Sequence, residues 1–246
     1  MSSEKFDYDV IVIGSGPGGE GAAMQATKEG LNTALIEKEK YVGGSCTHLG
    51  TIPSKSLRHT VHRLTTFIDD PLFSNDQILK RISYKNFLDR AKQVISQQVA
   101  RRQSHYVRNK VPILTGHATF VDKNTVGLIG HDGITKKLTA RYVVIATGSR
   151  PRRPDDIDFS QECIFDSDTV LKLNYCPRHM IIYGAGIVGC EYTSIFRALN
   201  MKVTLINTHE KLLGFLDEEI SSALSYHLRE KGVHIKQGER YSSIDV

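Results

Sequence analysis

Short apolar runs alternate with amphipathic stretches along the chain, and the first such run sets the pattern. Residues 8–13 (YDVIVI) are apolar and β-branched, which is typical of a strand buried on both faces of a parallel sheet. Amphipathic spacing then predicts a helix over 17–29 that ends at Gly30, and a second strand over 33–37 (TALIE). This order of strand, helix and strand predicts an α/β fold.

The opening pattern returns in the last third of the chain. The expected elements there are a strand at 180–183, a helix to about residue 199, a strand at 202–206, a helix at 217–231 and a strand at 233–236. Three strands are too few to complete a doubly wound sheet. The sequence therefore predicts two dinucleotide-binding, Rossmann-like folds in tandem, of which the second is incomplete.

The middle of the chain is less regular. Helices are expected at 54–67 and 84–109, and β-type runs at 112–114, 118–121, 125–129 and 142–146, with a hairpin turn at 122–124. A connector rich in proline and arginine follows the last of these strands. We therefore expect the first part of one domain at 1–150, a connector at 151–177 and a second domain at 178–246.

The first glycine-rich turn carries specific chemistry. Gly14, Gly16 and Gly19 stand in the G-x-G-x-x-G spacing between a strand and a helix, and Glu37 ends the next strand. In this arrangement Gly14 permits a tight turn, Gly16 lets the backbone approach a pyrophosphate, and Gly19 lets helix and strand pack closely. The helix N-terminus would bind the phosphates, and Glu37 would accept hydrogen bonds from a ribose. The alternative is a glycine turn without a ligand.

The second glycine-rich turn has the same spacing and a different final residue. Gly184, Gly186 and Gly189 repeat the motif, and Asn207 stands where the first fold has Glu37. An acidic residue at this position favours NAD, whereas an arginine pairs with the 2′-phosphate of NADP. Asn207 carries no charge, which suits a site that admits both nucleotides; the alternative is that it is a turn residue.

The cysteines exclude two kinds of site. Cys46 is followed five positions later by Thr51, so the loop has one half of a possible redox disulfide. Cys163, Cys176 and Cys190 are scattered and show no metal-type spacing. We therefore expect reduced thiols and no metal site.

Composition and charge limit the expected cellular location of the protein and the kinds of partner that it binds. The 246 residues carry a formal charge of +5, and 40% are hydrophobic. The basic runs are short and lack interleaved aromatic residues, so nucleic acid is not an expected partner. No apolar run approaches the roughly 20 residues of a membrane helix, and the N-terminus has no signal-peptide core. We expect a cytoplasmic protein with no membrane partner.

Four motifs together resemble those of a known family. They are GSGPGG with Glu37, GGSCTHLGTIPSK at 43–55, ATG at 146–148, and GAGIVGCE beginning at Gly184. Over essentially its whole length the chain resembles the N-terminal half of the pyridine nucleotide–disulfide oxidoreductases, the group of glutathione reductase and dihydrolipoamide dehydrogenase. The resemblance implies FAD in the first fold and NAD(H) or NADP(H) in the second. It also implies a dimerisation domain beyond residue 246, and hence a homo-oligomer.

The expected site residues combine the glycine motifs with this resemblance. Those expected at the cofactors are Gly14, Gly16, Gly19, Glu37, Lys38, Glu39, Lys40, Tyr41, Val42, Gly43, Gly44, Ser45, Cys46, Lys55, Ala118, Thr147, Gly148, Gly184, Gly186, Gly189 and Asn207. The resemblance gives catalytic roles to Lys55 and Glu191, as a pair beside the flavin, and to Cys46. The alternatives are two ordinary helix residues and a small residue that packs in its loop.

The departure from the family pattern suggests the reaction. Disulfide reductases of the family need cysteine at both ends of the loop, and Thr51 cannot form a disulfide. The loop resembles that of a member that transfers a hydride from NADPH to NAD through FAD without a disulfide substrate. We expect that activity in a flavoprotein oxidoreductase. The alternatives are a flavin-dependent NAD(P)H oxidase or diaphorase, and a truncated dinucleotide-binding module without turnover.

Overall fold

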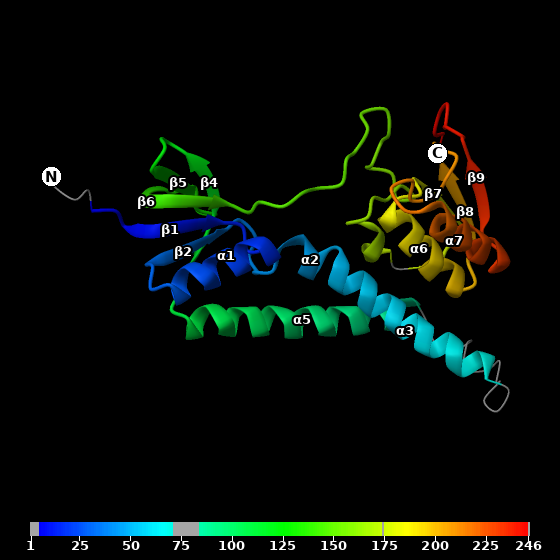
Figure 1. Ribbon diagram of the computed structural model, residues 1–246, viewed down its shortest axis with the longest axis horizontal. Coiled ribbons are helices and arrows are strands. Elements are labelled where there is room, and N and C mark those ends of the chain that lie inside the picture. Colours follow the sequence, from blue (N-terminus) through cyan, green and yellow to red (C-terminus); the bar gives the residue numbers. More distant parts are fainter. Residues whose placement is uncertain (1–4, 71–83, 174, 246) are drawn as a thin grey trace. The chain divides into compact units, whose positions relative to one another are not determined.

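The chain folds into two compact units, each around its own sheet (Figure 1). The computed structural model describes residues 5–70, 84–173 and 175–245. One unit combines Met1–Pro53 with Lys92–Arg150, and the other combines Ser54–Ala91 with Pro151–Val246. Residues 54–91, which the sequence suggested as part of the first domain, thus pack with the second unit. Functional boundaries between a FAD domain, a connector and a nucleotide domain stay a prediction.

The first unit contains a six-stranded sheet in the order β3-β2-β1-β6-β5-β4. Strands β3, β2, β1 and β6 are parallel, and β6, β5 and β4 form an antiparallel meander. The strands are β1 Tyr8–Ile13, β2 Thr33–Glu37, β3 Ile113–Thr115, β4 His117–Phe120, β5 Thr125–Ile129 and β6 Thr135–Ile145. β1 pairs with β2 on one side and β6 on the other, so it lies in the middle of the parallel part.

The two faces of this sheet have different covers. Helix α1 (Pro17–Lys28) and the C-terminal part of α5 (Tyr84–Arg108) pack on one face, and the antiparallel meander packs on the other. The first face buries Val10, Val12 and Leu35 with Ala23 and Tyr106; the second buries Ile11, Ala34 and Ile36 with Val126 and Ala140. Successive residues of β1 therefore enter opposite cores, which explains its unbroken apolar run.

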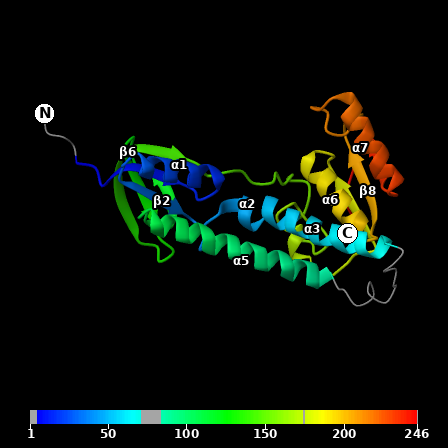
Figure 2. The same cartoon turned by 60° about the horizontal axis from the view of Figure 1, so that its bottom comes forward.

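The second unit contains three parallel strands in the order β7-β8-β9. These are β7 His179–Tyr183, β8 Lys202–Asn207 and β9 His234–Gln237, joined by α6 Ile187–Ala198 and α7 Glu218–Glu230. Figures 1 and 2 both show α6 and α7 beside β8. The short helix η1 (Val170–Lys172) precedes β7.

Two helices that begin or end in the first unit also belong to this core. Helix α3 (Thr51–Asp69) and the start of α5 contribute Leu57, Val61, Phe87 and Leu88, which pack in one cluster with residues of α6, β8, α7 and β9. The second unit is therefore built from two separate stretches of chain.

The predicted fold class is confirmed: the chain is α/β, with two Rossmann-like folds in tandem and the second incomplete. Three local differences have physical reasons. Helix α3 begins at Thr51, because Pro53 is tolerated in a first turn whose N–H groups have no helical partners. β6 extends back to Thr135, since its first half is an exposed antiparallel strand without an apolar run. Helix α2 (Gly44–His48) lies within an expected loop and is too short to show a period.

Candidate nucleotide-binding sites

The first glycine turn joins β1 to α1 with geometry that only glycine allows. Gly14 has φ +103°, and its N–H donates to the carbonyl of Ile36 at 2.8 Å. A Cβ at Gly14 would overlap the carbonyl oxygen of Ala146, and one at Gly19 would overlap that of Gly14. A Cβ at Gly16, by contrast, would meet no atom within 4 Å. Gly14 and Gly19 are thus needed for packing, whereas Gly16 leaves an open approach to the turn.

The start of α1 offers N–H groups to an anion. Gly16 is the N-cap residue, and no side chain caps the helix. The first hydrogen bond within the helix runs from the Glu20 N–H to the Gly16 carbonyl at 2.8 Å. The N–H groups of Gly18 and Gly19 therefore lie in a first turn without helical acceptors, where the helix dipole favours negative charge.

Glu37 ends β2 as a buried carboxylate and is 5% exposed. Its Oε2 accepts hydrogen bonds from the Ser15 N–H at 2.9 Å and from the Ser15 hydroxyl, and its Oε1 accepts one from the Glu39 N–H at 2.9 Å. The Ser15 hydroxyl oxygen accepts in turn from the Gly43 N–H at 2.8 Å. Oε1 retains acceptor capacity for a ribose hydroxyl. Sequence reasoning missed Ser15, although it is a polar residue inside the glycine motif.

The segment between β2 and α2 divides into two parts. Gly43 and Gly44 have φ values of +121° and +60°, and a Cβ at Gly44 would lie 2.8 Å from the Gly16 Cα. Val42 is buried. This part packs on the first glycine turn. Residues 38–41 are exposed, and their ionic and ring contacts are local: Lys38 pairs with Glu39, and Lys40 lies over the Tyr41 ring.

Three other residues expected at the first nucleotide lie at or just beyond the ends of strands. Ala146 follows β6 and lies against Gly14, which brings Thr147 and Gly148 to the glycine turn. Ala118 lies on β4, two residues after Gly116, whose N–H donates to the Glu37 carbonyl at 2.9 Å. The structure therefore gathers these residues at the carboxyl ends of β1, β2 and β6, where open α/β sheets bind ligands.

Cys46 is a free thiol. Ser45 and Cys46 lie on α2, Cys46 is half-buried, and all four cysteines of the chain are free. Thr51 occupies the first position of α3. The His48 ring Nε2 lies 2.9 Å from the Val42 carbonyl, so it donates there and holds the segment in place.

Lys55 and Glu191 form an ion pair within the second unit. Lys55 Nζ lies 2.5 Å from Glu191 Oε1, and the Ser54 hydroxyl donates to the same oxygen at 2.9 Å. The Glu191 side chain is 16% exposed and the Lys55 side chain 58%. The structure thus brings together two residues that are far apart in sequence, as the family resemblance implied. Because Glu191 accepts from two donors, its carboxylate is held in one orientation toward the lysine.

The second glycine turn repeats the first. Gly184 has φ +107°, its N–H donates to the Ile206 carbonyl at 2.8 Å, and a Cβ at Gly189 would overlap the Gly184 carbonyl. Gly186 is the N-cap of α6, without a side-chain cap, and a Cβ there would meet nothing within 4 Å. This turn also offers N–H groups without helical acceptors at a helix start.

The side chain of Asn207 has different hydrogen-bond partners from that of Glu37. It is 5% exposed, and its Nδ2 donates to the carbonyls of His209 and Lys211, both at 2.8 Å. Its two amide hydrogens are used within the loop that follows β8, so Oδ1 remains as an acceptor. The Lys211 ammonium lies 2.8 Å from Glu218 Oε1.

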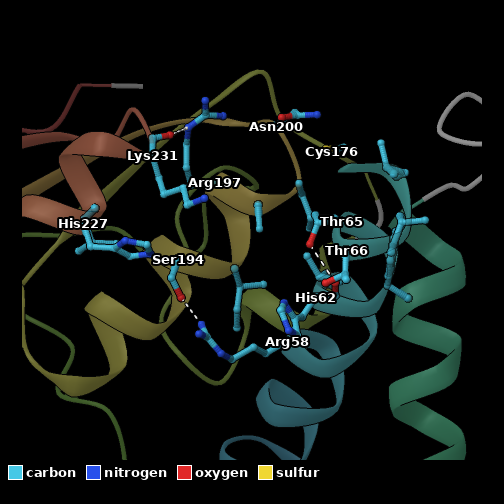
Figure 3. Close-up of a pocket in the computed structure, with 18 of the residues that line it drawn as sticks. Arg58, His62, Thr65, Thr66, Cys176, Ser194, Arg197, Asn200, His227 and Lys231 are labelled. Atoms are coloured by element: carbon cyan, nitrogen blue, oxygen red, sulfur yellow. Dashed lines mark hydrogen bonds between the residues drawn. The ribbon is translucent and has the colours of Figure 1, made fainter. Parts of the chain in front are cut away.

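A cavity of about 870 Å³ lies in the second unit (Figure 3). Side chains of α3, α6 and α7 line it, among them Arg58, His62, Arg197 and His227. Arg58 Nη1 donates to the Ser194 hydroxyl at 2.5 Å. None of the site residues expected from the sequence lines this cavity.

Two strand–glycine turn–helix units in one chain define a protein with two dinucleotide-binding folds. The chain belongs to the pyridine nucleotide-disulphide oxidoreductase family, whose pattern matches residues 8–246. Among the described residues, no helix has the length and apolar character needed to cross a membrane.

Two similar curated proteins carry the same name. The chain is 53% identical over 244 residues to the soluble pyridine nucleotide transhydrogenase of Enterobacter sp. (strain 638), covering 99% of this chain and 52% of that protein. It is 54% identical over 240 residues to the protein of that name from Citrobacter koseri, covering 98% and 52%. The chain thus spans about half the length of the curated relatives it matches.

Solved structures of low sequence identity share the fold. The HOCl-induced flavoprotein disulfide reductase RclA from Escherichia coli has a TM-score of 0.82 at 23% identity, over 96% of this chain and 50% of that one. LpdA from Mycobacterium tuberculosis has a TM-score of 0.86 at 24% identity, over 95% and 52%.

Proposed function

We propose that the chain is part of a flavoprotein oxidoreductase that transfers a hydride from NADPH to NAD+, giving NADP+ and NADH. The activity would be Si-specific NAD(P)+ transhydrogenase-like. The observation that carries the proposal is the pair of glycine turns, each with a glycine where a side chain is sterically possible but absent: Gly16 and Gly186. The name shared by relatives at 53% identity supports the reaction. FAD, when bound, would accept the hydride from one nicotinamide and return it to another.

The first turn fits the adenosine diphosphate half of FAD. The α1 N–H groups would bind the pyrophosphate, and the remaining capacity of Glu37 Oε1 would accept a ribose hydroxyl. Gly43 and Gly44 bring residues 42–46 onto the turn, so backbone and not charge would form much of the site. The exposed Lys38, Lys40 and Tyr41 would contribute less than their position in the motif suggested.

The second turn would receive the nicotinamide dinucleotides in turn. Asn207 adds no charge, and the Lys211 ammonium beside it is paired with Glu218. Neither feature rejects a 2′-phosphate by repulsion, nor does either bind it strongly. A site of this kind would admit both NADPH and NAD+.

The Lys55–Glu191 pair would act by electrostatics. Glu191 accepts from both Lys55 and Ser54, so it holds the lysine in one place. A fixed ammonium stabilises negative charge that develops on a neighbouring group. We assign this role to Lys55 toward the flavin, with Glu191 as the residue that positions it.

The absence of a second cysteine supports a reaction without a disulfide. Thr51 leaves Cys46 alone, and the other three cysteines are free and outside the loop. Dithionite should therefore reduce the FAD-loaded protein with two electrons per flavin, whereas a flavin with a redox disulfide takes four. Uptake of four electrons would contradict the assignment.

Substitution at the two open glycines tests the proposal directly. Gly16 has φ −65° and ψ 179°, and Gly186 has −76° and −173°, so valine fits both backbones. Gly16→Val should leave the melting temperature unchanged and weaken FAD binding at least tenfold, because the side chain would occupy the pyrophosphate approach. Gly186→Val should leave FAD binding unchanged and weaken NADPH binding.

A second candidate is a dinucleotide-binding module without turnover, for which the two glycine turns alone would be sufficient. An assay of NADPH oxidation with and without NAD+ separates the two. Formation of NADH supports transfer between nicotinamides. Nucleotide binding without NADH formation supports the module, and oxygen or dye reduction in place of NADH formation supports an oxidase or diaphorase.

A further inference from the structure

A buried polar contact joins three helices of the first unit. Arg102 on α5 donates from Nε to the Thr47 hydroxyl at 3.2 Å, and its Nη1 lies 3.3 Å from Glu20 Oε2 on α1. Thr47 has no exposed surface, and the side chains of Arg102 and Glu20 are 16% and 18% exposed. One guanidinium therefore links α1 to the helix that carries Cys46.

Thr47 lies directly under the left-handed turn of Gly43. A Cβ at Gly43 would come within 2.6 Å of the Thr47 hydroxyl oxygen. The Gly43 N–H donates to the Ser15 hydroxyl, which donates to Glu37. Contacts thus run without a break from the guanidinium of Arg102 to the carboxylate at the end of β2.

Helix α2 needs such an anchor. It has five residues, begins at two glycines and has no side-chain cap. A helix this short is unstable by itself, because nucleation fixes several residues before hydrogen bonds repay the entropy. A hydrogen bond from a charged donor is stronger than one between neutral groups, and a buried hydroxyl left without its partner destabilises the fold.

We propose that Arg102 is the positioning residue that fixes α2, and with it residues 43–46, against the first glycine turn. Glu20 orients the guanidinium through the ion pair, and the Thr47 hydroxyl accepts its hydrogen bond. The role toward FAD rests on the proposed function, whereas the effect on the loop is a property of the chain itself. Arginine suits the task because Nε and Nη1 lie at different positions of one rigid planar group and each contacts its own partner, whereas all three donors of lysine lie on a single nitrogen.

The neighbouring Arg101 provides a matched control. It is the same residue type on the same helix, one position earlier, and it is exposed. Arg102→Met should raise amide hydrogen exchange of residues 43–48 at least tenfold, and Arg101→Met should leave it unchanged. Arg102→Lys should resemble Arg102→Met, because its donors lie on one nitrogen, which does not occupy both the Nε position that contacts Thr47 and the Nη1 position that contacts Glu20.

Thr47 separates positioning from general stability. Thr47→Val keeps the shape and loses the acceptor, whereas Thr47→Ser keeps the acceptor. Thr47→Val should raise loop exchange and the FAD dissociation constant about tenfold, the change expected for about 1.4 kcal/mol, and shift the visible absorption bands of bound flavin. Thr47→Ser should restore all three readouts toward the parent.

The outcomes distinguish this inference from the proposed function. Exchange at 43–48 that responds equally to Arg101→Met and Arg102→Met overturns the positioning role, as does a Thr47→Val variant that behaves as the parent. If the parent chain binds no FAD, the proposed function fails, and the exchange measurements on the same proteins still decide the role of Arg102. Should Arg102→Met fail to fold, exchange in the Thr47→Val and Thr47→Ser variants decides whether the contact positions the loop.

Discussion

The two glycine turns have nearly the same backbone, yet different residues hold them. Gly14 and Gly184 have φ values of +103° and +107°, and both donate to the last but one residue of the next strand at 2.8 Å. At the first turn, the carboxylate of Glu37 reaches into the motif and binds Ser15. At the second, Asn207 turns away and binds the loop that follows it. The motif therefore fixes the backbone, and the last residue of the second strand determines which neighbouring segment is held by hydrogen bonds.

The surroundings of the two turns differ as well. The first lies against Ala146 at the end of β6, whereas a Cβ at Gly184 would meet nothing within 4 Å. Across the described parts of the chain, β7 pairs with β8 alone, so it is an edge strand. Crowding at Gly14 is thus a consequence of a neighbouring strand and not of the motif.

The largest expected effect tests what the turns share. Gly19→Ala places a Cβ onto the carbonyl oxygen of Gly14, the first glycine of its motif. Gly189→Ala does the same at the carbonyl oxygen of Gly184. Each substitution should therefore destabilise its own unit by about 3–5 kcal/mol. Chemical denaturation followed by unit-specific probes measures both. Gly21→Ala, at an exposed position within α1, is the control and should be neutral or stabilising by about 0.5–1 kcal/mol. Equal behaviour of all three variants would contradict the shared geometry.

The next effect tests where the turns differ in crowding. Gly184→Ala should cost only the strain of a positive φ, about 1–3 kcal/mol. Gly14→Ala adds overlap with Ala146 to the same strain and should cost clearly more. Unfolding free energies of the two variants give the difference. If Gly184→Ala costs as much as Gly14→Ala, then another part of the protein crowds the second turn.

A smaller effect tests the two holding residues. Glu37→Gln replaces one carboxylate oxygen with an amide nitrogen that cannot accept, and it should weaken FAD binding by about 1–3 kcal/mol. Asn207→Asp and Asn207→Ala both lose the two loop donors, but only aspartate adds charge. Asn207→Asp should therefore weaken NADPH binding by about 1–3 kcal/mol relative to NADH binding. Asn207→Ala should change the binding of the two nucleotides by the same amount. Equal flavin reduction by both nucleotides in the aspartate variant would remove Asn207 as the selector.

The smallest effect is confined to the second unit and depends on pH. Burial opposes ionisation of Asp166, but hydrogen bonds from Arg153 and Thr169 outweigh it and hold the pKa of the carboxyl below its usual value. A lowered folded-state pKa stabilises the fold above the unfolded value of about 3.9, and the gain is lost as pH falls through the folded pKa. Asp166→Asn should lower unfolding free energy by about 1 kcal/mol at pH 7, since Arg153 is half exposed. Melting curves of the parent and the variant should converge as pH falls below about 3.9, with the first unit unaffected.

The sequence predicted those features that local geometry dictates. The spacing of Gly14, Gly16 and Gly19 permits few backbones, and the apolar run of β1 requires two covered faces. Both sets of observations led to the correct fold class. The Lys55–Glu191 contact was implied by family resemblance, and the structure brings the two atoms to 2.5 Å.

Other parts depend on contacts that no local pattern encodes. Thr47 and Arg102 are 55 residues apart, and although Thr47 lies within the motif at 43–55, nothing in that motif names Arg102 as its partner. The direction of the Asn207 side chain depends on carbonyls of a loop whose course is not periodic. The assignment of residues 54–91 to the second unit likewise depends on which core their apolar faces join, and amphipathic spacing does not name the partner.

The divided origin of the second unit has a consequence during synthesis. Leu57, Val61, Phe87 and Leu88 find their core partners in residues up to Ile235. At about 5–20 residues per second, these side chains would wait roughly 7–30 s after Leu88 is made before the last partner is made. The strands that the structure describes in the first unit are all made by Ile145, so this part of the sheet is able to form earlier. Nascent chains of this protein are therefore expected to carry a helical pair with an uncovered apolar face, a substrate for chaperones that act at the ribosome.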